Sequence, residues 1–384
     1  MAKIIHRKDD LSRIRTLVAE FGATAILGAR QCGKSTLAGM MSSAHTFDLE
    51  NPRDLARLEN PQLALEDLKG LVVIDEIQRK PDLFPLLRYL IDQDRKRRFL
   101  ILGSASRDLI QQSSESLAGR IAYHPLGGFR LGDVGASHLK TLWLQGQFPR
   151  AYLATSIDQA FRWLEQYTLT FVERDIPQLG LAIPAQTMYR FWQMLSHYHG
   201  QLLNYSELAT SFGISDHTVR RYVDILAGTY MVRVLQPWHV NIGKRLVKRP
   251  KLYLRDSGLF HSLQSIDSPE ALQAHPKLGA SWEGFALETV ARALDKRDEE
   301  LYFWRTHTGN EIDLFWQAHG QNWAVEFKYA DAPRLEKAHN IAAQDMNLSH
   351  LWIVYPGQEA YALSETVSVL PLSHLANPWS YPGS

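Results

Sequence analysis

The segment Gly28-Ala-Arg-Gln-Cys-Gly33-Lys34-Ser35 constrains the fold of this 384-residue chain more than any other feature. It matches the pattern G-x-x-x-x-G-K-[ST] at every fixed position, and an apolar run, Ala23–Leu27, precedes it. Glycines let backbone N–H groups turn inward around phosphate oxygens, and a helix that follows presents its positive end to the same anion. The pattern therefore predicts a phosphate-binding loop between a buried strand and a helix.

The surrounding residues 1–132 alternate between strand-like and helix-like stretches, which is typical of a parallel α/β sheet covered on both faces. Helices are predicted at Leu11–Phe21 and from Ser35 onward. Strands are predicted at Ala23–Leu27, His45–Leu49, Leu71–Ile74 and Phe99–Leu102.

Several polar residues then take roles around a bound nucleotide. We expect Lys34 to reach the β- and γ-phosphates, Ser35 and Asp75 to hold Mg²⁺, and Glu76 to polarise the attacking water. A chance match in a glycine-containing loop, or two solvated acids at a strand end, is the alternative. The predicted nucleotide-binding residues are Gly28, Ala29, Arg30, Gln31, Cys32, Gly33, Lys34, Ser35 and Thr36.

Two further residues are catalytic candidates. Ser104 follows the predicted strand Phe99–Leu102, where a polar side chain could lie between the water and the γ-phosphate. Arg120, in the run Ser116–Arg120, could act as an arginine finger on the nucleotide of a neighbouring subunit, which would require a homo-oligomer. The alternative for Arg120 is a surface ion pair.

The segments Gly28–Ser35, Leu71–Gln78, Gly103–Ser106 and Ser116–Arg120 together resemble the predicted AAA+ ATPases of bacteria and archaea. In that family a C-terminal domain of unknown function follows the ATPase core. The resemblance covers most of the chain and implies ATP and Mg²⁺ as cofactors, a catalytic glutamate and a sensor-1 polar residue. It leaves open whether Arg120 acts in cis or in trans.

Residues 204–226 have the rhythm of a helix-turn-helix. Ser206 is predicted to cap the first helix and Ser215 the second, with Gly213 in the turn. The segments Tyr230–Leu235 and Leu252–Leu254 are predicted to form the wing of a winged helix.

The basic residues near this motif make DNA a candidate partner. The segment 240–255 carries six basic and no acidic side chains, Lys251 and Arg255 among them, and such side chains could contact phosphates in a salt-dependent way. The alternative is a module that packs against protein. The DNA-contact candidates are Arg220, Arg221, Lys244, Arg245, Lys248 and Arg249.

Near the C-terminus, Asp313, Glu326 and Lys328 fit the pattern D-x(n)-[DE]-x-K. Residues two apart on a strand share a face, so Glu326 and Lys328 are predicted to lie together. Glu288, on a predicted helix Trp282–Leu294, is a candidate fourth group. Residues 280–356 resemble the PD-(D/E)XK nuclease superfamily, which implies carboxylates that hold Mg²⁺. A nuclease fold without activity is the alternative.

Composition narrows the class of protein. Apolar residues make up 45% and charged residues 22% of the chain, which excludes a mainly disordered chain, and a single cysteine excludes a disulfide scaffold. We find no long apolar segment and no apolar leader, so we expect a cytoplasmic protein without a membrane partner. The predicted domains are 1–132 (AAA+-type ATPase), 133–185 (helical connector), 186–256 (winged helix-turn-helix) and 270–384 (PD-(D/E)XK nuclease-like), with a linker at Ser265–Pro276.

These features predict an ATP-hydrolysing α/β protein that acts on DNA and carries a magnesium-dependent nuclease domain. Two other interpretations stay open. In one, the ATPase is a switch or scaffold whose winged helix and degenerate nuclease-like domain bind protein partners. In the other, the phosphate loop serves a small-molecule kinase, although Glu76 beside Asp75 favours water as the acceptor.

Overall fold

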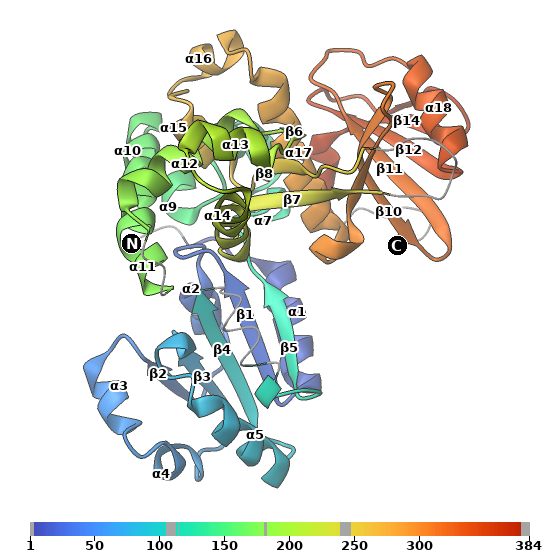
Figure 1. Cartoon of the computed structure of the whole chain (residues 1–384). Coiled ribbons are helices and arrows are strands. Elements are labelled where there is room, and N and C mark those ends of the chain that lie inside the picture. Colours follow the sequence, from blue (N-terminus) through green and yellow to red (C-terminus); the bar gives the residue numbers. More distant parts are fainter. Residues whose placement is uncertain (1–3, 105–112, 114, 180–182, 239–246, 378–384) are drawn as a thin grey trace. The chain divides into compact units, whose positions relative to one another are not determined.

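The computed structural model describes residues 4–104, 113, 115–179, 183–238 and 247–377. The chain divides into two compact units (Figure 1). Unit 1 comprises Met1–Phe129 with Gly228–Tyr230, and unit 2 comprises Arg130–Ala227 with Met231–Ser384. Each unit has a β-sheet of its own.

Unit 1 is built on a parallel sheet whose described strands have the order β2-β3-β4-β1-β5. Its strands are β1 (Ala23–Gly28), β2 (His45–Asp48), β3 (Leu71–Asp75), β4 (Arg98–Ser104) and β5 (Ile121–Pro125). Its helices are α1 (Lys8–Glu20), α2 (Lys34–Gly39), α3 (Pro52–Arg57), α4 (Pro61–Leu65) and α5 (Leu83–Gln93), with a 3-10 turn η1 (Ile77–Arg79). The predicted parallel sheet and its first four strands are confirmed, and β5 escaped prediction.

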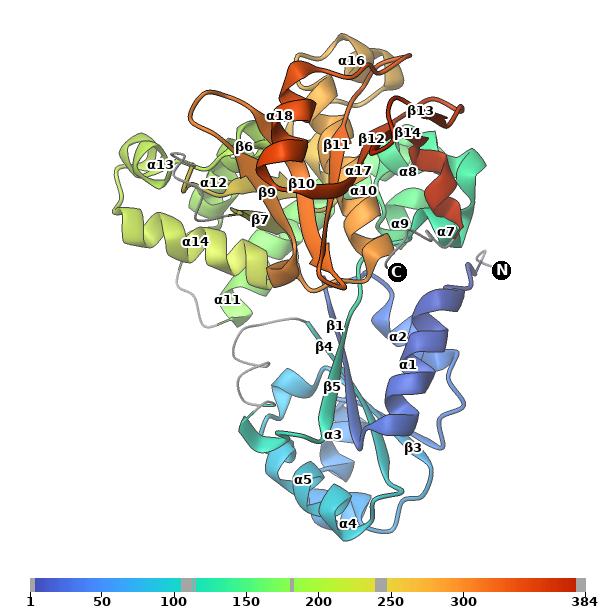
Figure 2. The same cartoon turned by 90° about the vertical axis from the view of Figure 1, so that its right-hand side faces the viewer.

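Helices cover both faces of this sheet, which explains why its strands read as unbroken apolar runs. All six residues of β1 are buried. On one face, Ala25 of β1 shares a core with Ile74 of β3 and Leu87 of α5. Helices α1 and α2 pack against β1 and β4 (Figure 2). Burial on both faces is the usual state of a parallel sheet.

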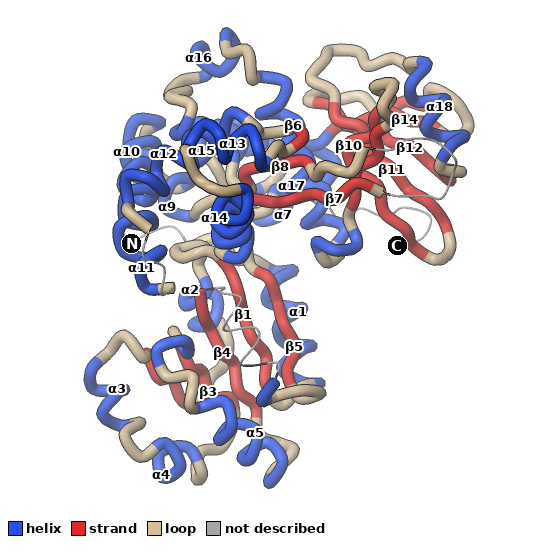
Figure 3. Tube along the Cα trace, in the orientation of Figure 1, coloured by secondary structure: helices blue, strands red, loops and turns tan. Residues whose placement is uncertain are grey.

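Unit 2 combines many helices with one mixed sheet (Figure 3). Its helices are α7 (Leu131–Val134), α8 (Leu139–Gln145), α9 (Pro149–Tyr152), α10 (Ile157–Thr170), α11 (Ile176–Gln178), α12 (Ala185–His197), α13 (Tyr205–Phe212), α14 (Asp216–Gly228, whose last residue belongs to unit 1), α15 (Ser257–Leu263), α16 (Pro269–Ala274), α17 (Leu278–Leu294) and α18 (Lys337–Asp345). Shorter turns are η2 (Ala136–His138), the π-helical η3 (Phe171–Asp175), η4 (Asp298–Glu300) and η5 (Leu372–Ala376). The helical character predicted from residue 133 onward is confirmed.

The described strands of unit 2 form a sheet of order β13-β14-β12-β11-β10-β9-β7-β8-β6. These strands are β6 (Gln201–Leu202), β7 (Val232–Pro237), β8 (Lys251–Leu254), β9 (Tyr302–Arg305), β10 (Glu311–Ala318), β11 (Gln321–Phe327), β12 (Leu348–Tyr355), β13 (Tyr361–Ala362) and β14 (Val367–Pro371). Strands β9, β10, β11 and β12 correspond to four segments that the sequence predicts as strands, Leu301–Trp304, Glu311–Trp316, Trp323–Tyr329 and Leu351–Tyr355.

This sheet continues from the middle of the chain into its C-terminal part. Strand β7 pairs with β8 antiparallel, so the two segments predicted to form the wing are neighbours, and β7 also pairs with β9 in parallel through Gln236 and Tyr302. The predicted linker at Ser265–Pro276 is wrong, because that stretch contains α16, capped by Ser268, and the strands on either side of it share one sheet. The middle and the C-terminal part of the chain therefore share one sheet and belong to one compact unit.

Helices α13 and α14 are joined by a short turn, as predicted. Gly213 adopts φ +63°, a left-handed conformation that glycine reaches without strain, and the Ser215 hydroxyl accepts the Thr218 N–H at 3.1 Å. The prediction that Ser206 caps α13 is wrong. Asn204 is the cap, and the Ser206 hydroxyl instead donates to Asp216 at 2.6 Å.

The C-terminal elements follow the order α17-β9-β10-β11-α18-β12. Strands β9, β10 and β11 are antiparallel neighbours, whereas β11 and β12 are parallel. Ala342 of α18 shares a core with Phe315 of β10 and Ile353 of β12, so α18 covers one face of these strands. The arrangement places Asp313 on β10 beside the end of β11.

Candidate functional site

The predicted phosphate loop begins where β1 ends, at Gly28, and two residues in it have positive φ, Gln31 (+62°) and Gly33 (+101°). A Cβ atom at position 28 would lie 2.1 Å from the carbonyl oxygen of Leu126, so only glycine fits there. Arg30 forms an ion pair with Glu50 at 3.0 Å. The loop has the tight backbone path that the glycine pattern predicts.

Lys34, the first residue of α2, is only 5% exposed. Its ammonium group donates to two carbonyl oxygens of the loop, that of Gly28 at 3.1 Å and that of Ala29 at 3.0 Å. Both acceptors are neutral. Phosphate oxygens are stronger acceptors for an ammonium group, because charge-assisted hydrogen bonds are about twice as strong as neutral ones.

The structure brings Ser35 and Asp75 together, although they are 40 residues apart. The Ser35 hydroxyl donates to one carboxylate oxygen of Asp75 at 2.5 Å, and the Glu76 N–H donates to the other at 2.9 Å. A hydroxyl and a carboxylate at the end of β3 are hard oxygen donors, the type that Mg²⁺ prefers. These residues fit the predicted metal position.

Glu76 directly follows β3 and adopts φ +55°, which is uncommon for a residue with a side chain. Its carboxylate accepts a hydrogen bond from the Gln78 side-chain amide. Burial raises the pKa of Glu76, and the nearby charge of Lys34 opposes this shift. The structure thus positions a carboxyl group with raised basicity beside Lys34 and Asp75.

A buried network that begins at Arg7 supports the phosphate loop, and no sequence motif indicates it. Arg7, 3% exposed, donates to the carbonyl oxygens of Cys32 at 3.1 Å and Gly128 at 3.0 Å. Its guanidinium pairs with Asp10, which in turn contacts His124 of β5 at 3.0 Å. The role of Arg7 cannot be predicted from a sequence motif, because its partners Cys32 and Gly128 are distant from it in the chain.

The other two predicted catalytic residues, Ser104 and Arg120, lie in different parts of unit 1. Ser104 is the last residue of β4, and its backbone lies in register with Gly28. Ser106 lies outside the described residues. Arg120 forms a two-pronged ion pair with Asp92 of α5, at 2.6 and 2.9 Å, and this pairing lowers the pKa of Asp92. Thr36 lies within α2.

The DNA-contact candidates fall into three groups. Arg220 and Arg221 are exposed on α14, and the Arg220 guanidinium lies 4.0 Å from the ring centre of Tyr205. Lys248 and Arg249 are also exposed. Lys244 and Arg245 lie outside the described residues.

The structure brings Glu326 and Lys328 together, at 2.9 Å between Oε1 and Nζ. Burial first, and then the charge of Asp313, raise the pKa of Glu326 well above its usual value. Asp313 accepts the Phe327 N–H at 3.0 Å, so it is tied to the same end of β11. These three predicted residues therefore share one region.

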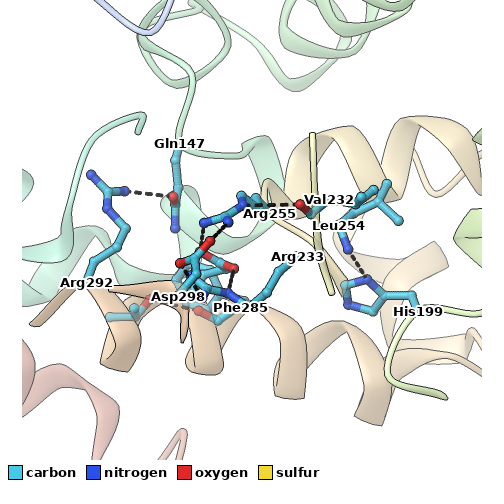
Figure 4. A network of polar contacts seen from close by, with 11 residues as sticks. Gln147, His199, Val232, Arg233, Leu254, Arg255, Phe285, Arg292 and Asp298 are labelled. Atoms are coloured by element: carbon cyan, nitrogen blue, oxygen red, sulfur yellow. Dashed lines mark hydrogen bonds and ion pairs between the residues drawn. The ribbon is translucent and has the colours of Figure 1, made fainter. Parts of the chain in front are cut away.

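Glu288 does not join this region. Its carboxylate pairs with Arg233 of β7 at 3.1 Å. Arg233 and Arg255 also converge on Asp298 of η4 (Figure 4). Glu283 and Glu288 are five positions apart on α17, a rotation of about 140° at 3.6 residues per turn. Glu283, rather than Glu288, is the acid of this helix that lies near Asp313.

Lys251 of β8 occupies the centre of that acidic region. Its ammonium contacts Asp313 at 3.0 Å, Glu283 at 3.1 Å and Glu311 of β10. Burial alone would lower the pKa of Lys251, but the surrounding negative charges raise it well above its usual value. The expectation that the basic run 240–255 is a solvent-facing phosphate contact is wrong for Lys251, which is 2% exposed, and for Arg255, which pairs with Asp298.

Comparison with known proteins gives the class of unit 1. Residues 20–134 match a family described as an AAA domain, which makes this part an AAA-type P-loop ATPase domain. Residues 136–270 and 278–375 match two domains of unknown function, DUF8612 and DUF4143.

The chain is 46% identical over 376 residues to the uncharacterized protein Rv2008c of Mycobacterium tuberculosis and to the uncharacterized protein Mb2031c of Mycobacterium bovis. The match covers 97% of this chain and 85% of each relative, so the chain belongs to the same family as these proteins. Among solved structures, it is similar to the Walker-type ATPase PABY2304 of Pyrococcus abyssi, with a TM-score of 0.46 and 16% identity over 68% of this chain and 96% of that one. Within the described part of the chain, every helix is too short or too polar to cross a membrane.

Proposed function

We propose that this protein binds ATP with Mg²⁺ at the loop Gly28–Ser35 and hydrolyses it. The observation that carries the proposal is the 2.5 Å contact between Ser35 and Asp75, which joins the phosphate loop to the carboxylate end of β3. A phosphate-binding loop and an acidic strand end that meet in this way are the two halves of a nucleotide hydrolysis site. The AAA domain match over residues 20–134 supports the same function.

Each residue then has a defined role. Lys34 exchanges its carbonyl partners for the β- and γ-phosphate oxygens, and Ser35 and Asp75 hold Mg²⁺. When bound, Mg²⁺ neutralises charge on the phosphates. Glu76 accepts the proton of the attacking water, a role that its raised pKa favours, and Gln78 orients its carboxylate. Ser104 would contact the γ-phosphate.

Hydrolysis fits this site better than transfer to a small molecule. A kinase would place an acceptor where Glu76 is, yet Glu76 follows Asp75 directly and is half-buried beside Lys34. A carboxylate at this position can orient water. We therefore propose water as the acceptor.

Binding of a fluorescent ATP analogue tests the first step. Lys34→Ala should abolish saturable binding, and Ser35→Ala should remove the enhancement of affinity by Mg²⁺. Lys96→Ala is the matched control, since Lys96 is an exposed lysine of the same unit. Equal affinity of the Lys34→Ala and Lys96→Ala variants would refute the assignment of the loop.

We also propose that unit 2 contacts DNA through α14. The supporting observation is the exposure of Arg220 and Arg221 on the second helix of a helix-turn-helix, with Lys248 and Arg249 exposed as further candidates. Strand β7 is hydrogen-bonded on both sides, by β8 and β9. We therefore do not include β7 among the DNA-contacting elements, although its segment is part of the predicted wing. A scaffold that binds protein through this surface is the competing function.

A salt titration of DNA affinity separates the two functions. The double variant Arg220→Ala/Arg221→Ala should weaken binding and reduce the slope of log affinity against log salt by about 1 to 2. Arg334→Ala, an exposed arginine elsewhere in unit 2, should leave the slope unchanged. An unchanged slope in the double variant would favour the scaffold.

Arg120 supplies a proposal about assembly. In trans action, Arg120 would leave Asp92 and reach the nucleotide of a second copy of the chain. Mixing Lys34→Ala chains with Arg120→Ala chains would then restore hydrolysis, because each supplies what the other lacks. Absence of restored activity would favour the surface ion pair.

The predicted magnesium-dependent nuclease at Asp313, Glu326 and Lys328 stays a prediction. Nicking of supercoiled plasmid with Mg²⁺ or Mn²⁺, compared with Asp313→Ala, tests it. Because Lys251 already fills the acidic region, we place the degenerate alternative first.

A further inference from the structure

The acidic region of unit 2 contains its own cation. Three carboxylates from two elements, Glu283 of α17 with Glu311 and Asp313 of β10, contact the single ammonium group of Lys251. The distances to Glu283 and Asp313 are 3.1 and 3.0 Å. These are hydrogen-bond lengths, whereas carboxylate oxygens lie about 2.0–2.6 Å from Mg²⁺ or Ca²⁺. At Glu283 and Asp313 the spacing suits an ammonium group.

The position of Lys251 is set by the fold. It lies on β8, which pairs with both β6 and β7, and its side chain is 3% exposed. Tyr253, two residues along and therefore on the same face, donates its hydroxyl to Glu283 at 2.6 Å. Lys251 therefore lies on a strand that is paired on both sides, with its side chain inside the fold.

A second observation shows that the region retains spare coordination capacity. Glu326 is 7% exposed, and within the described part of the chain its Oε2 atom has no hydrogen-bond partner. Burial and the charge of Asp313 raise its pKa, so the two carboxyl groups lie within electrostatic reach of each other. A buried carboxylate oxygen without a partner is costly, and a cation nearby would satisfy it.

We propose that Lys251 is the resident cation of this region and that it excludes a divalent metal from Asp313 and Glu283. A divalent ion would have to enter beside a fixed positive charge and compete for the same oxygens. Replacing Lys251 by an uncharged residue of similar length removes the ammonium group, and this should convert the region into a divalent-cation site. The wild-type chain holds its acidic region closed to metal.

This proposal is independent of ATP hydrolysis in unit 1. It implies that metal-dependent cleavage of nucleic acid is switched off in the wild-type chain as long as Lys251 stays in place. It also gives a physical reason why these carboxylates can lie together without metal, since an ammonium group among them offsets part of their mutual repulsion.

Mn²⁺ binding, followed by electron paramagnetic resonance on the full-length chain without nucleotide, tests the proposal. All samples carry Asp75→Ala, which removes the proposed Mg²⁺ ligand of unit 1, so that failure of the nucleotide assignment cannot affect the result. We expect the parent to bind no Mn²⁺ in unit 2 and Lys251→Met to gain one ion per chain. Adding Asp313→Asn should remove that ion. Lys328→Met, which removes the lysine beside Glu326, is the matched control and should gain none.

Two results would overturn the proposal. The first is one Mn²⁺ bound by the parent and lost on Asp313→Asn. The second is a folded Lys251→Met chain that binds none. If Lys251→Met does not fold, thermal unfolding of the parent and of Asp313→Asn decides. A melting temperature that Mn²⁺ leaves unchanged in both supports the proposal, and one that Mn²⁺ raises only in the parent contradicts it.

Discussion

Two buried lysines, Lys34 in unit 1 and Lys251 in unit 2, show how the same side chain can be kept available or fully occupied. Their exposed fractions are similar, 5% and 2%. Lys34 donates to two neutral carbonyl oxygens of its own loop. Lys251 contacts three carboxylates from two elements. Burial alone therefore does not tell whether a lysine can bind a ligand.

The difference lies in the charge of the partners. A phosphate oxygen offers Lys34 a stronger interaction than the carbonyls do, so the ammonium group can change partners when a nucleotide binds. The carboxylates around Lys251 already supply charge-assisted bonds in a desolvated region, where removing one partner leaves uncompensated charge. We expect perturbations of the two sites to have different kinds of consequence.

The largest effect should follow loss of the base beside Lys34. Glu76→Gln keeps the size of the side chain but cannot accept a proton, so we expect ATP turnover to fall by about 10²- to 10⁴-fold with little change in nucleotide affinity. Glu283→Gln, which alters the carboxylate beside Lys251, should leave turnover unchanged. Phosphate-release kinetics check both variants, and turnover near the wild-type rate in Glu76→Gln would exclude Glu76 as the base.

The stability cost of removing each lysine sharpens the comparison. Lys251→Met leaves the buried Asp313 and the half-buried Glu283 and Glu311 without their cation, and should lower the free energy of unfolding of unit 2 by about 3–5 kcal/mol. Lys34→Met releases only neutral carbonyls and should cost unit 1 about 1 kcal/mol. Urea denaturation measures both. Equal costs would mean that the partners' charge does not distinguish the two sites.

A buried histidine provides a contrast with both lysines, because it stays neutral. The Nδ1–H of His261 donates to the Leu144 carbonyl at 3.0 Å, and its Nε2 accepts from the Ser281 hydroxyl at 2.7 Å. Burial lowers the pKa of His261 to about 4. The ordinary value, which we take for the unfolded chain, is about 6.5.

The pKa of His261 is lower in the folded chain than in the unfolded one, so its stabilising contribution is complete above pH 6.5 and is lost as pH falls from 6.5 toward 4. The slope of the free energy of unfolding in this window should reach about 1.4 kcal/mol per pH unit for this group. His261→Gln should flatten that slope. Parallel pH profiles of the two proteins would argue against a neutral buried ring.

The smallest effect is expected at the edge of the phosphate loop. Arg30 and Glu50 form an ion pair at 3.0 Å whose side chains are 22% and 42% exposed. Solvent screens such pairs, so Arg30→Ala should change the free energy of unfolding by less than about 0.5 kcal/mol. A larger loss in urea denaturation would show that this pair, unlike most exposed ones, supports the loop.

Features that depend on local spacing could be predicted from the sequence. The phosphate loop, the strand that ends at Asp75 and the helix-turn-helix around Gly213 are all set by residues close together in the chain. Glu326 and Lys328 were likewise predicted to share a face, because they are two apart on an extended segment.

Features that depend on distant segments could not be predicted. Arg7 contacts Gly128, 121 residues away, and Lys251 contacts Asp313, 62 residues away. Lys251 belongs to a basic run that indicates a solvent-facing surface, yet the pairing of β7 with both β8 and β9 carries it into the interior. Glu288 is the predicted fourth group, yet Glu283 is the acid of α17 that lies beside Lys251, because the rotation of α17 cannot be read from a motif.

Steady-state ATP hydrolysis, with and without duplex DNA, by the wild type and Lys34→Ala tests the central claim most directly. Our account predicts phosphate release by the wild type, loss of that release in Lys34→Ala, and a several-fold increase on adding DNA only in the wild type. Phosphate release at the same rate in both proteins would contradict the assignment of Lys34 and of the loop that holds it.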